Sequence, residues 1–322
     1  MFKSRIIVPT IKNDHSGYNQ ILKIAAQIFK NPIQHFDFDF KQCSKIEHNG
    51  VVMLGALARY VDFHNKHKIN ILINPKPSQQ ATRAGVMFLV DSMSSVVRDS
   101  LEHNNFLNYF TNANYSYPKG GYIGYREHTT NFDADAIAEH LEIDWLSADK
   151  LKLSPKLKNA ILSRILEIFT NAYGHGVLLQ PLHSLGVYSC GQYDSKTKKL
   201  NISVLDFGIG IVENVKKQTG ITNDFEALNW ALTRGNSTRT DSTSKDMARG
   251  LGFDLLNRFV TINEGELRIY SNNVQAISNG SGSMVLSENK EHLNGTLVSI
   301  TIQCDDRHYL FASEAGQQES FF

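Results

Sequence analysis

Two different periods of apolar residues alternate along the first hundred residues of the chain. Segments with an apolar residue at every second position, or with a short apolar run between turn residues, predict strands. Segments with apolar residues three and four positions apart predict helices. The predicted strands are residues 5–9, 36–40 and 68–73, and the predicted helices are residues 18–29, 50–63 and 81–93. Strands that alternate with helices are typical of an α/β layer domain.

The later part of the chain has a different order of elements. A long helix is predicted after Ser154-Pro155, because serine is a favoured N-cap residue and proline fits the first helical turn. Two strands follow at residues 186–192 and 200–205, joined by a polar turn. The remaining predicted elements are a helix from Gly252 and strands at residues 267–270, 283–286 and 296–302.

A change of pattern between these two parts predicts a domain boundary. Residues 112–124 contain tyrosine, glycine and proline without periodicity, which indicates a loop, and residues 132–150 are acidic and partly helical in pattern. We therefore expect two α/β domains. The predicted units are a first domain at residues 1–125, a connecting segment at 126–150, a second domain at 151–304 and a tail at 305–322.

The composition limits the classes of function that need to be considered. The chain has 322 residues, of which 41% are apolar and 20% charged, as in an ordinary globular protein. Its formal net charge of +1 does not indicate a nucleic-acid partner. The three cysteines are far apart and lack the spacing of metal ligands. Because no apolar run is long enough for a signal peptide or a membrane span, we expect a cytoplasmic protein without a membrane partner.

Three polar residues form a row along the predicted helix after Ser154. Glu167, Asn171 and His175 are four positions apart, so they lie on one side of the helix. A stripe of apolar residues at helical spacing forms the neighbouring face: Leu157, Ile161, Ile165, Ile168 and Ala172. Any one of the three polar residues alone would most often be a solvated edge. As a row, an amide oxygen can bind a phosphate-bound Mg²⁺ and a carboxylate one turn away can accept a proton.

A second polar feature is Asp206, which ends the alternating strand around Ile202 and Val204 and is followed by Gly208 and Gly210. The glycines allow the chain to turn with its backbone accessible. A carboxylate at such a turn can accept a hydrogen bond from an exocyclic amino group, such as that of adenine. For this pattern in isolation, a strand-ending aspartate in a simple turn is the more common explanation.

A second pair of glycines, Gly250 and Gly252 on either side of Leu251, precedes a predicted helix. Backbone N–H groups at a helix N-terminus favour a phosphate, although a tight turn into the helix is the simpler alternative. Between the two glycine pairs, residues 211–248 are polar and include Thr238 and Arg239. A connection of this length is typical of a lid or of disorder, and its position favours a lid over phosphates.

Together these elements resemble the GHKL superfamily, which comprises the Bergerat-fold ATP-binding domains of gyrase, heat-shock chaperones, mismatch-repair ATPases, histidine kinases and anti-sigma serine kinases. The resemblance covers about residues 150–303 and includes Gly295-Thr296 before the last strand. It implies ATP with Mg²⁺ as ligands, and a sandwich of helices on one face of a mixed sheet. The implied roles are Mg²⁺ binding for Asn171, adenine recognition for Asp206 with support from Thr296, phosphate contact for His175, and a nucleotide cradle for Gly208, Gly210, Gly250 and Gly252. Thr238, Arg239 and Leu251 are also expected to bind the nucleotide.

The first part of the chain resembles a STAS domain, the fold of anti-sigma antagonists, over about residues 30–100. In that family a serine at the start of a helix is phosphorylated by a GHKL kinase. The matching turn here is Glu47-His48-Asn49-Gly50, which has no hydroxyl group. The resemblance therefore implies a module that docks a protein partner, without the usual phosphorylation switch.

Three functions follow from these features. The first is an ATPase in which Glu167 activates water and nucleotide drives lid closure or homodimer formation. The second is a serine protein kinase of the anti-sigma type that acts on a separate partner. The third is a non-catalytic module whose binding depends on ATP. The sequence favours the first, because the STAS-like segment does not supply the hydroxyl group that a kinase would need.

Overall fold

The first half of the chain forms a three-stranded parallel sheet with the order β1-β2-β3. The computed structural model describes residues 3–72, 85–110, 118, 121–128, 132–177, 185–236 and 252–315. The elements of this part are β1 (Lys3–Ile7), α1 (His15–Lys30), β2 (His35–Asp39), α2 (His48–Leu72) and β3 (Val86–Leu89). Since parallel strands joined by helices have right-handed connections, α1 and α2 cover the same face of this sheet.

The second sheet has five antiparallel strands in the order β4-β5-β6-β8-β7. These strands are β4 (Tyr122–His128), β5 (Val187–Asp194), β6 (Lys199–Asp206), β7 (Glu266–Ser278) and β8 (Met284–Gln303). β4 crosses the predicted boundary at residue 125 and pairs with β5. The predicted strands 186–192, 200–205 and 267–270 are confirmed as β5, β6 and part of β7. The predicted strands 283–286 and 296–302 are wrong as separate elements, because both belong to the single strand β8.

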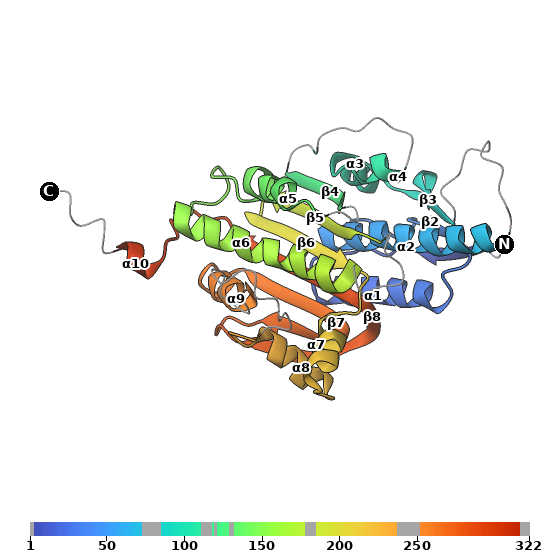
Figure 1. The fold of residues 1–322 in the computed structure, drawn as a ribbon. Helices are drawn as coiled ribbons and strands as arrows, with labels where there is room; N and C mark the ends of the chain where they lie inside the picture. The colour runs from blue at the N-terminus through green and yellow to red at the C-terminus, as the bar shows by residue number, and fades with distance from the viewer. Residues whose placement is uncertain are drawn as a thin grey trace.

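Helices cover both faces of the five-stranded sheet (Figure 1). On one face lie α6 (Pro155–Asn171) and α9 (Gly252–Ile262), and α9 packs on β7 and β8. On the other face α1 packs on β8, and α2 packs on β5 and β6. The side chains of β6 point alternately to the two faces. Leu200, Ile202 and Val204 belong to the hydrophobic core on the α6–α9 side, whereas Leu205 belongs to the core on the α1–α2 side.

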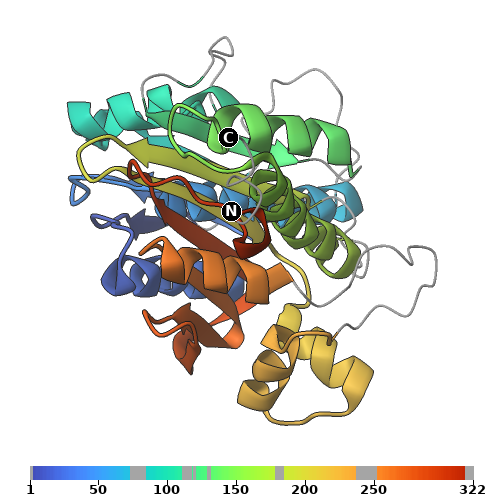
Figure 2. The same cartoon turned by 90° about the vertical axis from the view of Figure 1, so that its left-hand side faces the viewer.

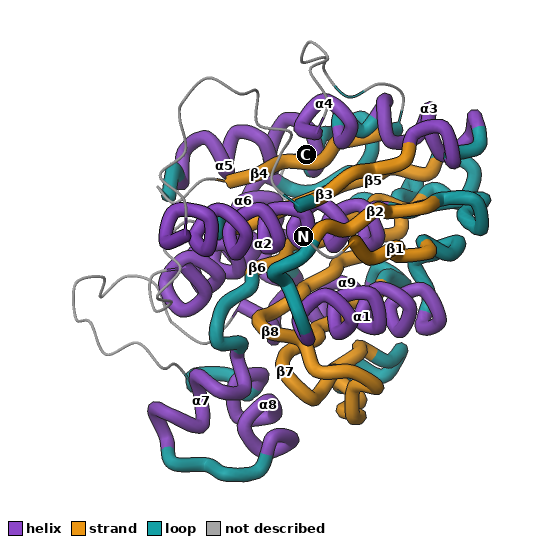
Figure 3. The backbone as a smooth tube through the Cα atoms, turned by 90° about the vertical axis from the view of Figure 1, so that its right-hand side faces the viewer, coloured by secondary structure: helices purple, strands orange, loops and turns teal. Residues whose placement is uncertain are grey.

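The core on the α1–α2 side joins the two sheets. It contains Ile6 and Phe38 of the small sheet, Leu205 of β6 and Leu297 of β8, together with most buried residues of α1 and α2. Both helices therefore lie between sheets, and Figure 3 shows them among the strands of the two sheets. The outer face of the small sheet combines charged residues with the exposed Ile7 and Met87, and on it Lys3 and Asp37 form an ion pair of 2.8 Å.

Shorter elements complete the structure. They are η1 (Val90–Ser92), α3 (Ser95–His103), α4 (Phe106–Phe110), α5 (Ala134–His140), η2 (Leu141–Trp145), η3 (Ala172–Val177), α7 (Ile211–Thr219), α8 (Asp224–Leu232) and α10 (Ala312–Ala315). In Figure 2, α7 and α8 form a pair at the periphery of the molecule. Among the described residues, no helix has the length and apolar character to span a membrane.

The prediction of an α/β protein is confirmed. The expected mixed sheet with helices on one face is not found in the second half, where all five strands are antiparallel and helices cover both faces. Two predicted elements are also wrong. Residues 68–72 continue α2 instead of forming a strand. No glycine or proline interrupts the chain between Phe63 and Leu72, so the helix has no reason to end earlier. Residues 86–89 form β3 instead of a helix, paired with β2 from Phe36. A run of four apolar residues has too little periodicity to distinguish the two structures.

Candidate functional site

Asp206 is a buried carboxylate at the last position of β6. It pairs with Val187 of β5 and with Thr296 of β8, and it is 5% exposed. Its Oδ1 accepts a hydrogen bond of 2.8 Å from the backbone N–H of Gly208. Burial raises the pKa of Asp206 to about 7, against the opposing effect of backbone hydrogen bonds from Gly208 and Thr296. Within the part of the chain that the structure describes, no cationic side chain contributes to this pKa.

The turn after Asp206 depends on glycine at two positions. Gly210 has φ of +80°, and a Cβ atom there would lie 2.2 Å from Oδ1 of Asn272. Gly295, on the neighbouring strand, has φ of +120°, and its Cβ would lie 2.0 Å from the carbonyl oxygen of Asp206. Side chains at these positions are excluded both by backbone strain and by space. Gly210 and Gly295 therefore allow strands β7 and β8 to approach the turn closely.

Two residues that the sequence analysis did not select, Ser271 and Asn272 of β7, fix the start of α7. The N–H of Ile211 donates to Ser271 Oγ at 2.8 Å and to Thr296 Oγ1 at 3.3 Å. Asn272 Oδ1 accepts from the N–H of Glu213 at 3.3 Å, and its Nδ2 donates to the carbonyl oxygen of Ile209 at 3.0 Å. These side chains satisfy N–H groups that a helix N-terminus leaves without partners. The polar run from Ser271 to Asn273 within a strand was the available signal.

Helix α6 has the predicted start and the predicted polar row. Ser154 caps it by accepting a hydrogen bond of 3.1 Å from the N–H of Leu157. Glu167 is partly exposed and forms an ion pair of 3.2 Å with Arg164, one turn earlier on the same helix. Asn171 is partly exposed and forms no side-chain hydrogen bond with the described residues.

The end of α6 continues directly into a wider helical turn. This turn, η3, packs against β5, β6 and β8, so Asn171 is followed at once by backbone that contacts the sheet bearing Asp206. Wider turns of this kind are frequent at functional sites. The backbone of His175 belongs to η3, whereas its side chain lies outside the described part of the structure.

The predicted lid is wrong in its first half. Residues 211–232 form α7 and α8, in which Val212, Val215, Ala227 and Leu228 are buried in the core. Gly220, in the left-handed conformation, ends α7, and Asn223 caps α8. This turn chemistry divides a polar segment into two amphipathic helices.

Several predicted site residues lie outside the described residues. They are Thr238, Arg239, Gly250 and Leu251, together with the later part of the proposed lid at residues 237–248. Gly252 begins α9, as predicted from the glycine pair and the apolar positions that follow it. Within the described residues, no group of three or more His, Cys, Asp or Glu side chains has the arrangement of a metal site.

No known family model matches the chain, and no curated protein matches it.

Proposed function

We propose that the chain binds an adenine nucleotide with its adenine ring at Asp206. The observation that carries the proposal is a buried carboxylate at the end of a strand and beside a tight glycine turn, with no cationic partner among the described residues. A buried charge without a partner is unfavourable. An exocyclic amino group supplies the missing donor, and hydrogen bonds to a charged acceptor are about twice as strong as neutral ones.

The phosphates and Mg²⁺ have candidate residues at two helix ends. Mg²⁺ bound to nucleotide phosphates needs few protein oxygens, and the side-chain oxygen of Asn171 fits that requirement at the end of α6. The backbone N–H groups at the start of α9, from Gly252 onward, suit a phosphate group. The start of α7 is less suitable, because Ser271, Asn272 and Thr296 already accept hydrogen bonds from its N–H groups.

In this proposal Glu167 accepts a proton from the water that attacks the terminal phosphate, which makes the protein an ATPase. The ion pair with Arg164 favours a second candidate function, a non-catalytic module whose binding depends on ATP. Arg164 lies one turn earlier on the same helix, and its ion pair occupies the carboxylate that a water molecule would need. Measurement of phosphate release by the purified protein distinguishes the two functions.

Serine kinase activity has less support than ATP hydrolysis or ATP-dependent binding, because the first half of the chain offers no site for phosphorylation at the turn that resembles a STAS domain. The turn from Glu47 to Gly50 starts α2 and is turned toward the five-stranded sheet. His48 is 2% exposed, and its Nε2 lies 3.4 Å from Ser299 Oγ of β8. Neither its composition nor its burial suits a phosphorylation site. A kinase reaction would therefore need a hydroxyl group from a separate protein.

The architecture proposed with this function has a STAS-like unit at residues 1–125 and a Bergerat-type unit at residues 151–304. A cytoplasmic location, a protein partner for the first unit and a nucleotide-dependent homodimer belong to the same proposal. The order of the five antiparallel strands, with α6 and α9 on one face, supports a nucleotide site between those helices and the sheet.

Calorimetric titration of the protein with ADP and Mg²⁺ tests the nucleotide site. We expect binding by the natural chain and a loss of affinity in Asp206→Asn. Asp194→Asn is the matched control, because Asp194 ends the neighbouring strand β5 at the opposite end of the sheet. Absence of binding by the natural chain, or equal affinity in Asp206→Asn, would remove adenine recognition from Asp206.

A further inference from the structure

The residue after Asp206 joins the candidate nucleotide site to the first half of the chain. The side chain of Phe207 is 3% exposed and contacts Phe29 of α1 and Tyr60 of α2 edge to face, with 5.4 Å between ring centroids in each pair. Phe29 and Tyr60 also contact each other, at 5.0 Å. The three aromatic rings, which come from α1, α2 and the segment after β6, therefore pack against one another next to Asp206.

A second contact joins α2 to the strand opposite Asp206. The side chain of Asn294 lies near the hydroxyl group of Tyr60, where it opposes the rise in the pKa of Tyr60 that burial causes. Asn294 directly precedes Gly295, whose missing side chain allows β8 to approach the Asp206 carbonyl group. Tyr60 thus lies against the chain on both sides of the site, at Phe207 directly after β6 and at Asn294 of β8.

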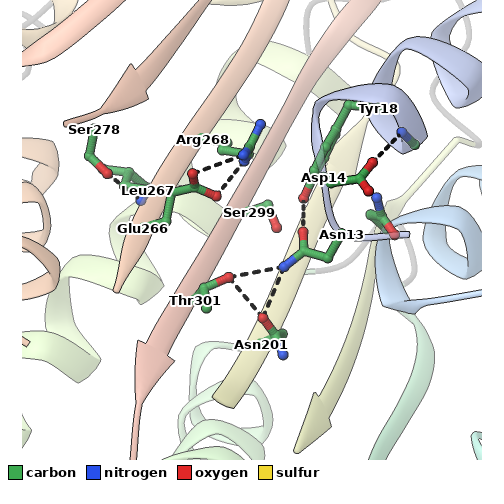
Figure 4. A network of polar contacts seen from close by, with 12 residues as sticks. Asn13, Asp14, Tyr18, Asn201, Glu266, Leu267, Arg268, Ser278, Ser299 and Thr301 are labelled. Atoms are coloured by element: carbon green, nitrogen blue, oxygen red, sulfur yellow. Dashed lines mark hydrogen bonds and ion pairs between the residues drawn. The ribbon is translucent and has the colours of Figure 1, made fainter. Parts of the chain in front are cut away.

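The other end of α1 is fixed to the same sheet by a polar network (Figure 4). Nδ2 of Asn13 donates to Asn201 Oδ1 and to Thr301 Oγ1, at 3.1 Å in each case. The Tyr18 hydroxyl donates to Asn13 Oδ1 at 2.8 Å, and its ring stacks on Tyr270 at 4.8 Å.

These contacts orient α1 along β6. Its first turn lies at Asn201, near the start of β6, and its last turn lies at Phe207, just beyond the end of that strand. The helix and the strand therefore run in the same direction. Because both ends of α1 are attached to the sheet, Phe29 has little freedom to move away from Phe207.

We propose that Phe29 and Tyr60 are positioning residues for Asp206, so that helices of the first half of the chain complete the nucleotide site of the second half. This inference rests on the proposed function. The two rings hold Phe207, Phe207 fixes the direction of the Asp206 backbone, and the buried carboxylate keeps one orientation toward the adenine. In this arrangement, nucleotide affinity depends on side chains that the ligand does not touch.

The test compares variants of the complete chain in pairs. Phe29→Leu loosens the ring cluster, and its control Phe38→Leu makes the same change in the same hydrophobic core, where Phe38 stacks on Phe88. Tyr60→Phe removes the hydroxyl group near Asn294. Its control Tyr122→Phe makes the same change on β4, where the hydroxyl group donates to Ser100 and not to any residue of the ring cluster. The affinity for ADP with Mg²⁺ is measured by calorimetry from pH 5.5 to 8.5, and the stability of each variant is measured by urea unfolding.

We expect Phe29→Leu to weaken ADP binding by about three- to tenfold, as the loss of aromatic pair contacts implies. Tyr60→Phe should weaken ADP binding by a smaller factor. Because this variant retains the aromatic ring, it still tests the inference if Phe29→Leu does not fold. The loosened turn should also admit water to Asp206, which lowers the pKa of its carboxyl group. The pH at which ADP affinity is half-maximal should therefore be lower in Phe29→Leu than in the natural chain. The two controls should lose stability without either change in binding.

Two results would overturn the inference while leaving the proposed function intact. One is unchanged ADP affinity and pH profile in both Phe29→Leu and Tyr60→Phe. The other is an equal effect of Phe38→Leu at equal stability, which would assign the loss to general loosening. Failure of the natural chain to bind ADP would instead refute the proposed function, and the positioning role with it.

Discussion

Gly295 lies so close to Asp206 that a Cβ atom at residue 295 would be 2.0 Å from the carbonyl oxygen of Asp206. Replacement by alanine therefore forces β6 and β8 apart at the site or distorts a backbone with φ of +120°. We expect Gly295→Ala to reduce the free energy of unfolding by about 1–3 kcal/mol, the usual cost of overpacking. Urea unfolding measures the loss. Gly280→Ala is the matched control, because its Cβ would have no neighbour within 4 Å, and it should be nearly neutral.

The raised pKa of Asp206 makes stability depend on pH. Burial raises this pKa to about 7, whereas an aspartate in the unfolded chain has a pKa of about 4. Between these values the folded state holds a proton that the unfolded state has released, so the contribution of Asp206 to stability falls as the pH rises from 4 to 7. Asp206→Asn should remove this dependence and increase stability above pH 7. Urea unfolding of both proteins at pH 5 and pH 8 checks this, and parallel curves would contradict the assignment.

Nucleotide binding should release protons near neutral pH. If the adenine amino group donates to the charged form of Asp206, binding lowers the pKa of the carboxyl group from its value of about 7. Affinity for ADP should then decline as the pH falls below 7. Calorimetry at pH 7 in two buffers of different ionisation enthalpy measures the proton release directly. Asp206→Asn should show neither proton release nor the decline.

Two buried histidines should make the protein sensitive to acid. Burial lowers the pKa of His48 to about 4 and that of His128 to about 3, and for His128 the nearby His140 and Arg126 act in the same direction. In the unfolded chain a histidine has a pKa of about 6.5. As the pH falls below 6.5, the unfolded state therefore gains protons first and the folded state loses stability, down to the folded pKa values.

The variant His128→Gln tests this origin, because glutamine can retain a hydrogen bond to Ser189, whose Oγ lies 2.9 Å from His128 Nε2. Urea unfolding at pH 7.5 and pH 5 should show a smaller loss of stability in the variant than in the natural chain. The exposed His308→Gln serves as the control and should leave the loss unchanged. An equal loss in all three proteins would place the acid sensitivity elsewhere.

Turnover should depend on Glu167 if the protein is an ATPase. A general base contributes about 10²–10⁴-fold to the rate, so Glu167→Gln should keep ATP affinity and lose most phosphate release. The exposed Glu102→Gln on α3 is the control and should have the natural rate. A phosphate-release assay at saturating ATP measures both variants. Equal rates would remove Glu167 from the reaction, and absence of release by the natural chain would favour the binding module.

The sequence predicted those elements whose signals are local. Ser154-Pro155 predicted the start of α6, and the alternation before Asp206 predicted β6 and its end. The failures have local causes as well, since residues 68–72 had no signal to end α2, and residues 86–89 were too short to show a period. Neither periodicity nor motifs indicated that α7 and α8 would fold from a polar segment.

The supports of the candidate site were beyond prediction because they depend on contacts distant in sequence. Asn272 holds the turn before α7 from a strand that comes much later in the chain, with separations of 63 and 59 positions. Asn201 belongs to no motif of the sequence. In the structure it is 7% exposed and receives a hydrogen bond from Asn13, 188 positions earlier.

The sharing of one core by both sheets has a consequence during synthesis on the ribosome. The helices α1 and α2 are made early, but their partners Leu205, Tyr270 and Leu297 belong to strands that appear much later. Translation proceeds at about 5–20 residues per second, so the apolar sides of these helices wait roughly ten seconds or more for the five-stranded sheet. During that interval the nascent chain presents the surface that chaperones bind, and slow codons placed after α2 would lengthen the exposure.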